Sequence, residues 1–204
     1  MTTATPVRVP RGEARARLIE AARGLVRRKG FAATSVDDLC AAAGVTKGAF
    51  FHHFASKEAL GVALIDDWTA MTGAMFASHP YNFKDDPLDR VFAYIDLRRE
   101  LLGQPVTEFS CVAGTTVQEA FETSPPIRAA ADRSIRSGFN HVLPHLQVAL
   151  EAHPVPGVTA EGLAQQVQVA VQGGIILAKA LNAAAPAREA FDHLERYLRL
   201  LFGR

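Results

Sequence analysis

Side chains that suit nucleic-acid contact are concentrated in one segment, GVTKGAFFHHFASKEAL, which covers residues 44 to 60. Thr46, Lys47 and the His52-His53 pair offer hydroxyl, ammonium and imidazole groups, which hydrogen-bond to phosphate oxygens and to base edges. Gly48 allows another surface to approach the backbone closely. Elsewhere in the sequence no nucleophile–base set, phosphate-binding loop or carboxylate pair stands out. The sequence therefore predicts a binding protein and not an enzyme.

The elements that position these groups are predicted to be two short helices and a tight turn. Thr34 is placed to cap the first helix, and Asp37 stands where it can answer from the third helical position. Gly44 ends that helix, because a residue with positive φ is favoured there. Thr46 then caps the second helix. Two helices joined by a short turn that contains glycine form the helix-turn-helix pattern, which reads the DNA major groove.

The same residues carry a family resemblance. GVTKGAFFHHFASKEAL resembles the signature of the tetracycline-repressor (TetR/AcrR) family of transcriptional regulators, and residues 17–45 fit that family's first two helices. Beyond these N-terminal residues the chain resembles the family only in its all-helical plan. The resemblance implies an all-α fold, in which an N-terminal helix-turn-helix domain of three helices precedes a larger helical domain for ligand binding and dimerisation. The expected division is a disordered arm at 1–10, a DNA-binding domain at 11–56 and the larger domain at 57–204.

The resemblance also implies which residues contact DNA. Lys57 is expected on a phosphate, and independently Thr34 is placed to offer its hydroxyl to the sugar-phosphate backbone. The family usually has tyrosine where this chain has Phe51, so one phosphate contact should be missing, at a cost of about 1 kcal/mol. Phe50 and Phe54 are expected to plug the core instead. The residues implied to face DNA are Thr46, Lys47, Gly48, Ala49, Phe51, His52 and His53.

Two histidine pairs are alternative candidates for metal ligands. His52 and His53 are adjacent, so on a helix their side chains point about 100° apart, and no third ligand is evident. They are otherwise a solvated pair. His141 and His145 have a spacing that can grip a metal, but Pro144 between them should bend the helix. No metal and no cofactor are expected.

Charge and hydropathy limit the class of protein. Residues 1–60 hold ten Lys and Arg against five Asp and Glu, a net charge of +5, and the remaining residues carry −4. A basic N-terminal part followed by an acidic remainder suits a chain that binds a polyanion at one end. The alternative is an amphipathic helix whose arginine face is only solvated. No apolar run is long enough for a membrane span, and the N-terminus lacks the apolar core of a signal peptide. The expected location is the cytoplasm.

Apolar periodicity predicts helices through the rest of the chain, and nothing alternates for long enough to be a strand. The segment HPYNFKDDP at 79–87 is predicted to be a loop because of its Pro, Asn and Asp content. The predicted helices are 11–29, 57–77, 88–103, 112–122, 126–151, 160–183 and 187–202.

The last two predicted helices each carry an apolar stripe that suits a homodimer, since one recognition helix reads too few bases for selectivity. A four-helix interface made by two copies of this pair is the family's arrangement. The alternative is that both stripes close the chain's own core. The predicted dimer residues are Val167, Val171, Gly174, Ile175, Ala178, Leu181, Phe191, Leu194, Leu198 and Leu201.

The middle helices are predicted to enclose a cavity for an apolar small molecule, because they combine aromatic and methionine side chains with a few polar groups. Ordinary core packing is the alternative for each residue. Cys111 is additionally a candidate sensor of electrophiles or oxidants if its thiol pKa is lowered. The candidate lining residues are Trp68, Met71, Met75, Phe92, Ile95, Phe109, Cys111, Gln118, Phe121 and His145.

The predicted function is that of a ligand-responsive, DNA-binding transcriptional regulator. The expected partners are a double-stranded DNA operator, a small-molecule effector of unknown identity and a second copy of the chain. A repressor that a small molecule releases from a palindromic operator fits these features best. The alternative is a small-molecule or thiol-redox sensor that acts through a protein partner without binding an operator, and the missing hydroxyl at Phe51 is its only support.

Overall fold

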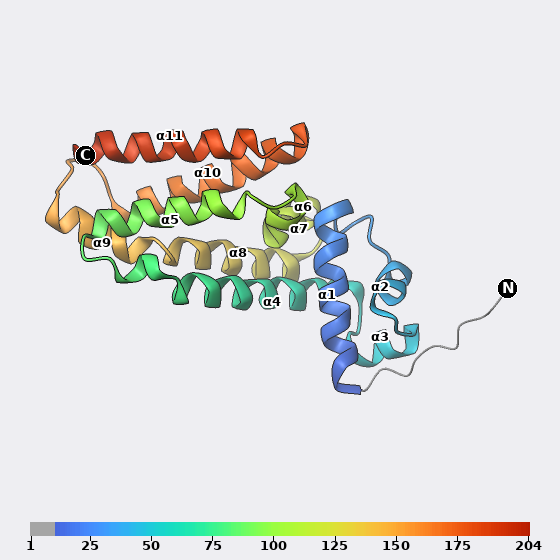
Figure 1. Ribbon diagram of the computed structural model, residues 1–204. Helices are drawn as coiled ribbons and strands as arrows, with labels where there is room; N and C mark the ends of the chain where they lie inside the picture. Colours follow the sequence, from blue (N-terminus) through green and yellow to red (C-terminus); the bar gives the residue numbers. More distant parts are fainter. Residues whose placement is uncertain (1–10) are drawn as a thin grey trace. The chain divides into compact units, whose positions relative to one another are not determined.

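The computed structural model describes residues 11–204, and every regular element in that range is a helix (Figure 1). The predicted all-α fold is therefore confirmed for the described residues, while the predicted arm at 1–10 lies outside them. The helices are α1 Arg11–Lys29, α2 Val36–Ala43, α3 Lys47–His53, α4 Lys57–Ser78, the short 3-10 helix η1 Pro80–Phe83, α5 Pro87–Leu101, α6 Val106–Phe109, α7 Val112–Ala120, α8 Pro125–Asn140, α9 Leu143–Ala152, α10 Ala160–Leu181 and α11 Ala185–Phe202.

The structure differs from the predicted helix boundaries in three places. The single helix expected at 126–151 is two helices, because α8 ends at Asn140 and α9 restarts with Pro144 in its first turn. Proline lacks an amide hydrogen and is tolerated only at the start of a helix. The expected loop at 79–87 contains η1, whose first residue is also a proline. The short helix α6 was not predicted from the sequence.

The chain forms two compact units. Unit 1 contains the described residues up to Thr69 together with Val112–Ser134, and unit 2 contains Ala70–Cys111 and Ile135–Arg204. Helices α4 and α8 thus contribute residues to both units, and α7 belongs to unit 1 although it follows α5 and α6 in sequence. The predicted boundary between a DNA-binding domain that ends at residue 56 and a larger domain that begins at residue 57 stays a prediction.

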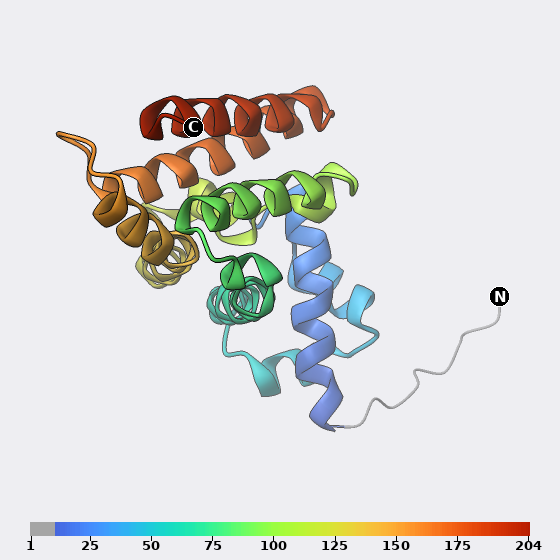
Figure 2. The same ribbon diagram turned by 60° about the vertical axis from the view of Figure 1, so that its left-hand side comes forward.

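Unit 1 is built around the buried face of α1. Leu18, Ala22 and Val26 recur at helical spacing and are almost fully buried. Helices α2 and α3 pack on α1, as Figures 1 and 2 both show, and contribute buried Leu39 and Phe50. The helix-turn-helix pair is therefore held by an apolar core on its inner side.

Unit 2 has its core between α5, α9, α10 and α11. Helices α10 and α11 lie side by side in both Figure 1 and Figure 2 and form the most extensive helix pair. A Cβ added at Gly174 would meet the Ala187 Cα at 3.1 Å, so the glycine permits this close packing. Arg99 of α5 ties that pair to the rest of unit 2, since its Nε donates to the Asp192 carboxylate at 2.8 Å and its Nη2 donates to Glu195. Within residues 11–204, no helix is long and apolar enough to cross a membrane.

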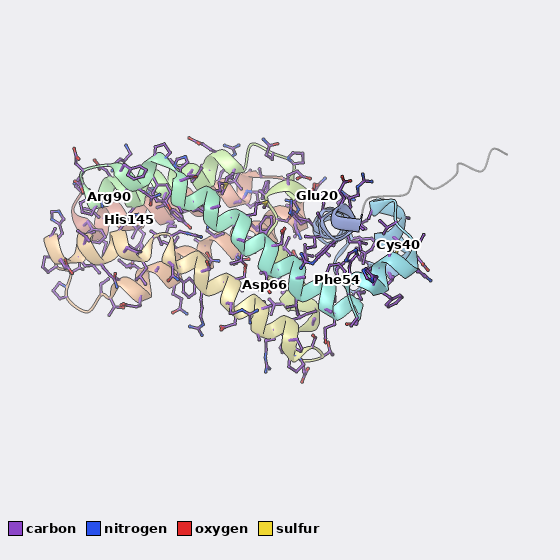
Figure 3. The ribbon with its side chains drawn as sticks, turned by 90° about the horizontal axis from the view of Figure 1, so that it is seen from below. Glu20, Cys40, Phe54, Asp66, Arg90 and His145 are labelled. Carbon is purple, nitrogen blue, oxygen red and sulfur yellow. The ribbon has the colours of Figure 1, made fainter. Side chains whose placement is uncertain are left out.

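An aromatic cluster in unit 2 encloses His141. Its ring stacks on Phe76 with centroids 4.7 Å apart, and the Tyr81 hydroxyl donates to the His141 carbonyl at 3.2 Å. Burial and the nearby charge of Arg98 lower the pKa of His141 from its ordinary value of 6.5 to about 4. Burial also lowers the pKa of His145, with a smaller contribution from Arg90, which lies near it in Figure 3.

Acidification is therefore expected to destabilise unit 2 between pH 6.5 and about pH 4. The depressed pKa means that the unfolded chain takes up a proton at His141 before the folded chain does, so the stabilisation is complete above pH 6.5 and is lost as the pH falls through 4. After allowance for the ring's partial contact with water, the change should be about 2 kcal/mol. Urea unfolding followed by circular dichroism across this pH range measures it.

The matched variant for this measurement is His141→Phe, which keeps a ring on Phe76 and removes the titrating group. Its unfolding free energy should depend less on pH than that of the wild type. The exposed His153 provides the control, and His153→Gln should leave the profile unchanged. Equal pH dependence in the wild type and His141→Phe would contradict the assignment.

Candidate DNA-binding site

The turn between α2 and α3 has the predicted helix-turn-helix geometry. Gly44 ends α2 in the left-handed conformation, with φ 65°, and its amide donates to the carbonyls at the end of that helix. Any residue with a Cβ would be strained there. Thr46 caps α3, and its Oγ1 accepts a hydrogen bond from the Ala49 amide at 3.2 Å. These two residues fix the angle at which α3 leaves the turn.

The cap of α2 differs from the sequence prediction by one residue. Ser35, not Thr34, is the N-cap, and it forms a capping box with Asp38. Thr34 is only 1% exposed, and its hydroxyl donates to the Gly30 carbonyl at 2.6 Å. That hydroxyl is committed to the turn after α1, so the predicted role of Thr34 on the sugar-phosphate backbone does not agree with its placement. Ser35 lies exposed at the same helix end and is the better candidate.

Helix α3 separates its aromatic residues into an inner and an outer set. Phe50 is 0% exposed and Phe54, its C-cap, is 4% exposed, as expected for core plugs. Figure 3 marks Phe54 where the chain leaves α3. Phe51, by contrast, is 55% exposed and makes an edge contact with Phe50. The remaining predicted DNA contacts of α3 also reach the surface: Thr46, Lys47, Gly48 and His52 are exposed, and Ala49 and His53 are partly exposed.

Two cation–carboxylate pairs border this surface. The Lys47 ammonium lies 2.8 Å from an Asp37 carboxylate oxygen, and this hydrogen bond raises the pKa of Lys47. The Lys29 ammonium lies 2.7 Å from an Asp38 carboxylate oxygen. This contact, together with the hydrogen bonds that Asp38 accepts from Ser35, holds the pKa of Asp38 well below its usual range. Exposed pairs of this kind contribute little to stability. Lys47 can therefore exchange Asp37 for a DNA phosphate or base at small cost.

Lys57 has a different environment from Lys47. Its ammonium donates to the Ala32 carbonyl at 3.1 Å and lies 4.6 Å from the centre of the Phe31 ring. Desolvation lowers the pKa of Lys57. These contacts join the start of α4 to the turn after α1. Lys57 thus has a packing role in unit 1 that the sequence did not reveal, and its predicted phosphate contact stays a prediction.

Glu119 of α7 fastens the same turn from another side. Its carboxylate accepts a hydrogen bond from the Ala32 amide at 2.6 Å. A Cβ at Gly30, whose φ is +87°, would collide with that carboxylate. The pairing spans 87 positions of sequence, and no local pattern predicts it. Residues from α4 and α7 therefore hold the turn that precedes the helix-turn-helix pair.

Separate variants of Lys47 and Lys57 should affect different quantities, DNA affinity for the first and protein stability for the second. Lys47→Ala removes an exposed ammonium and should weaken operator binding about tenfold, with an altered sequence preference and an unchanged melting temperature. Lys57→Ala removes a hydrogen bond and a cation–π contact, so it should cost about 1 to 2 kcal/mol of unfolding free energy. Fluorescence anisotropy on labelled DNA and thermal melts measure the two effects. A Lys57→Ala protein with the wild-type melting temperature and a flatter salt dependence would favour the phosphate role instead.

The predicted cavity residues do not all belong to one unit. Trp68, Gln118 and Phe121 belong to unit 1, and Phe121 is 54% exposed. In unit 2, Phe92 and Ile95 are buried core residues, and Met71 is 41% exposed. Unit 2 carries a pocket of about 470 Å³, but none of the ten predicted residues lines it; its lining is Gly157, Val158, Thr159, Gly162, Leu163, Gln166 and Tyr197. The remaining candidates, Met75, Phe109, Cys111 and His145, are partly buried in unit 2.

Most of the predicted dimer residues are buried within a single chain. Seven of the ten lie in the core of unit 2, Gly174 is buried where α10 packs against α11, and Leu201 is partly buried beside them. Leu181 alone of the ten is exposed, at 65%. The apolar stripes on the two helices are thus used to close the chain's own core, and these buried residues cannot form a surface for a second copy. The buried residues are Val167, Val171, Gly174, Ile175, Ala178, Phe191, Leu194 and Leu198.

The two histidine pairs have different surroundings. The rings of His52 and His53 stand nearly perpendicular, with centroids 5.0 Å apart. His145 bonds to the Asn82 side chain at 3.0 Å. No group of three or more His, Cys, Asp or Glu residues able to hold a metal ion occurs among residues 11–204. Cys40 is buried in α2, where burial raises the pKa of its thiol.

Comparison with known proteins agrees with this architecture. Residues 18–64 match the family described as bacterial regulatory proteins, tetR family, and residues 87–193 match the C-terminal domain described as transcriptional regulator LmrA/YxaF-like. The chain is 33% identical to the HTH-type transcriptional regulator EthR of Mycolicibacterium smegmatis over 63% of this chain and 61% of that protein. It is 26% identical to the HTH-type transcriptional repressor NemR of Escherichia coli K12 over 91% of this chain and 94% of NemR.

A solved TetR transcriptional regulator from Chloroflexus aurantiacus has the same fold. The TM-score is 0.79 at 27% identity, over 92% of this chain and 95% of that one. These likenesses do not favour the alternative of a sensor that no longer reads DNA. The helix-turn-helix match and the C-terminal match together cover both parts of the chain. The chain belongs to the TetR family and is a DNA-binding transcriptional regulator.

Proposed function

We propose that the chain is a homodimeric repressor that binds a palindromic operator and leaves it when a small molecule binds unit 2. The observation that carries the proposal is the outer face of α3. It presents Lys47, Gly48, Phe51 and His52 to solvent, while buried Phe50 fixes the helix from within. We further propose that the protein acts in the cytoplasm, where such an operator is found.

The outer face of α3 suits the major groove in shape and chemistry. Gly48 has no side chain and an exposed backbone, so a DNA strand can approach closely. Lys47 supplies a positive charge, and His52 can donate to a phosphate or a base edge. Phe51 cannot donate, so we expect it to make apolar contacts, such as with a thymine methyl. Selectivity should therefore depend mainly on Thr46, Lys47 and the histidines.

For the second copy of the chain we propose a contact surface on the outer face of α10 and α11. Large apolar side chains are exposed along one side of each helix, and Gly173 between them has open space where a Cβ would stand. Large exposed apolar side chains concentrated on one helix pair are typical of an interface. The exposed apolar residues of this outer face are Val169, Ile176, Leu177, Leu181, Tyr197 and Leu200.

Release by the effector follows from linkage. A molecule that binds unit 2 more tightly in one arrangement of the dimer favours that arrangement. If its two α3 helices no longer match successive major grooves, operator affinity falls, and by reciprocity the operator weakens effector binding by the same factor.

Footprinting on the DNA upstream of the protein's own gene tests the function. We expect a protected palindrome whose half-sites are about one helical turn apart. Lys47→Ala should weaken protection, whereas a charge removed from unit 2, as in Arg196→Ala, should not. Absence of any protected palindrome at moderate salt, together with binding that ignores sequence, would overturn the proposal.

A further inference from the structure

Arg98 of α5 is a partly buried cation among neutral groups. Its Nε and Nη2 both donate to the Tyr94 hydroxyl, at 3.0 and 2.6 Å. Its guanidinium carbon lies 4.3 Å from the centre of the Phe76 ring. Among residues 11–204, no carboxylate lies within ion-pair distance of Arg98. The side chain therefore has aromatic neighbours and no counter-ion.

The neighbouring arginine shows the contrast. Arg99 contacts three carboxylates, those of Asp96, Asp192 and Glu195. At the end of the chain, Arg204 is likewise paired with acidic side chains. Unit 2 thus compensates these guanidinium groups with anions. A charge that is taken partly out of water without an anion is costly. Arg98 has a hydroxyl and the rings of neutral side chains as partners, whereas Arg90 on the same helix has two backbone carbonyls.

The charge of Arg98 acts on its surroundings in the expected direction. His141 stacks on the same Phe76 ring that Arg98 covers. The positive charge of Arg98 adds to burial in lowering the pKa of His141. The place is therefore electropositive, with the rings of Phe76 and Tyr94 against the cation and the His141 ring against Phe76.

We propose that Arg98 is the anchor for an organic acid, a small molecule with a carboxylate or sulfonate on an apolar or aromatic body. The inference rests on the proposed function, since it names the chemical class of the effector that unit 2 binds. A guanidinium has five N–H donors, and the donors of Arg98 that do not serve Tyr94 can bind an anion in charge-assisted hydrogen bonds. An apolar body adds hydrophobic burial to these charge-assisted bonds, which a fully hydrated inorganic anion does not.

A purely structural role for Arg98 makes a different prediction. The guanidinium could only clamp α4 to α5 through its cation–π contacts with Phe76 and Tyr94. Loss of the clamp would lower stability and would affect charged and neutral ligands alike. An anchor for an acid, by contrast, discriminates between an anion and a neutral molecule of the same shape.

Matched pairs of probes separate these roles. 1-Naphthoate and 1-naphthamide have nearly the same shape and differ in charge, and hexanoate and hexanamide form a second pair. By isothermal titration calorimetry, we expect the full-length wild type to bind at least one acid about tenfold or more tightly than its amide. Arg98→Met keeps an apolar stem and should reduce the ratio to about one by weakening the acid alone. Arg98→Lys should give an intermediate ratio because it keeps the charge and loses the fork.

Arg90→Met is the control on the same helix, because Arg90 donates to the Lys84 and Asp85 carbonyls and lies near His145. It should keep the acid preference. Equal ratios in the wild type and Arg98→Met, or no preference for either acid in the wild type, would overturn the inference. Operator binding is measured on the same samples: its absence would overturn the proposed function and leave the acid preference readable, whereas normal operator binding without acid preference would overturn only the role of Arg98.

Discussion

Replacing Ile176 and Leu177 by glutamate is expected to split the dimer and to weaken operator binding by about a hundredfold or more. The two side chains are 47% and 52% exposed in the single chain, at the middle of the outer face of α10 and α11. Each buried leucine or isoleucine contributes about 1.5 to 3 kcal/mol. Two carboxylates would instead be desolvated against a copy of themselves, with like charges facing across the two-fold axis. A monomer would then bind one half-site without the gain from a linked second site.

Sedimentation velocity and an operator mobility shift measure the two effects in parallel. Val148→Glu is the matched control, since Val148 is an apolar residue of α9 in the same unit with 45% exposure. That variant should remain dimeric and bind the operator normally. A double variant that still sediments as a dimer would exclude the outer face as the interface and require another contact surface.

The sequence could predict that α10 and α11 matter for packing but not which face meets which partner. Helix α10 is apolar on two sides, so a helical stripe identifies a buried face without saying what buries it. The adjacent glycines illustrate the difficulty. Gly174 packs against the backbone of Ala187, while Gly173 faces open space. The sequence assigned Gly174 to the dimer interface, and only the fold places it in the core and its neighbour Gly173 at the surface.

The helix-turn-helix pair was more predictable because its signals are local. Gly44 and Thr46 act within a few residues of their own positions, and the structure gives both their predicted places. Thr34 and Ser35 are neighbouring residues with hydroxyl groups, and either could cap α2. The sequence could not show that the Thr34 hydroxyl would donate to the Gly30 carbonyl instead. The Glu119 contact with the same turn joins distant segments. Such pairings depend on the three-dimensional arrangement, for which no sequence spacing gives a signal.

The predicted cavity residues were uncertain for the same reason, because the sequence does not show how separate helices pack. Aromatic and methionine residues suit both a ligand site and a core, and their spacing on separate helices does not decide between them. Phe92 and Ile95 became core, while Phe121 reached the surface of unit 1. The more informative feature was the absence, among residues 11–204, of a carboxylate beside Arg98, which becomes visible only when the neighbours of Arg98 are known.

Phe50→Ala is expected to cost unit 1 about 3 to 5 kcal/mol and to abolish operator binding. Helix α3 has seven residues, of which Phe50 alone is buried, so this side chain is its main attachment to the core. A helix this short has little stability of its own. Without the ring, α3 should lose its fixed orientation even where its outer residues are unchanged.

The adjacent Phe51 provides the control, because Phe51→Ala makes the same chemical change on an exposed ring. It should cost less than about 1 kcal/mol of unfolding free energy, since most of that ring is already in water. Hydrogen exchange of the α3 amides, thermal melts and anisotropy on operator DNA distinguish the two variants. Similar losses of stability at positions 50 and 51 would mean that α3 does not present one face to the core and the other to DNA. A large loss at Phe50 alone would instead link operator binding to the rigidity of α3, because the residues that face DNA would be identical in the variant and the wild type.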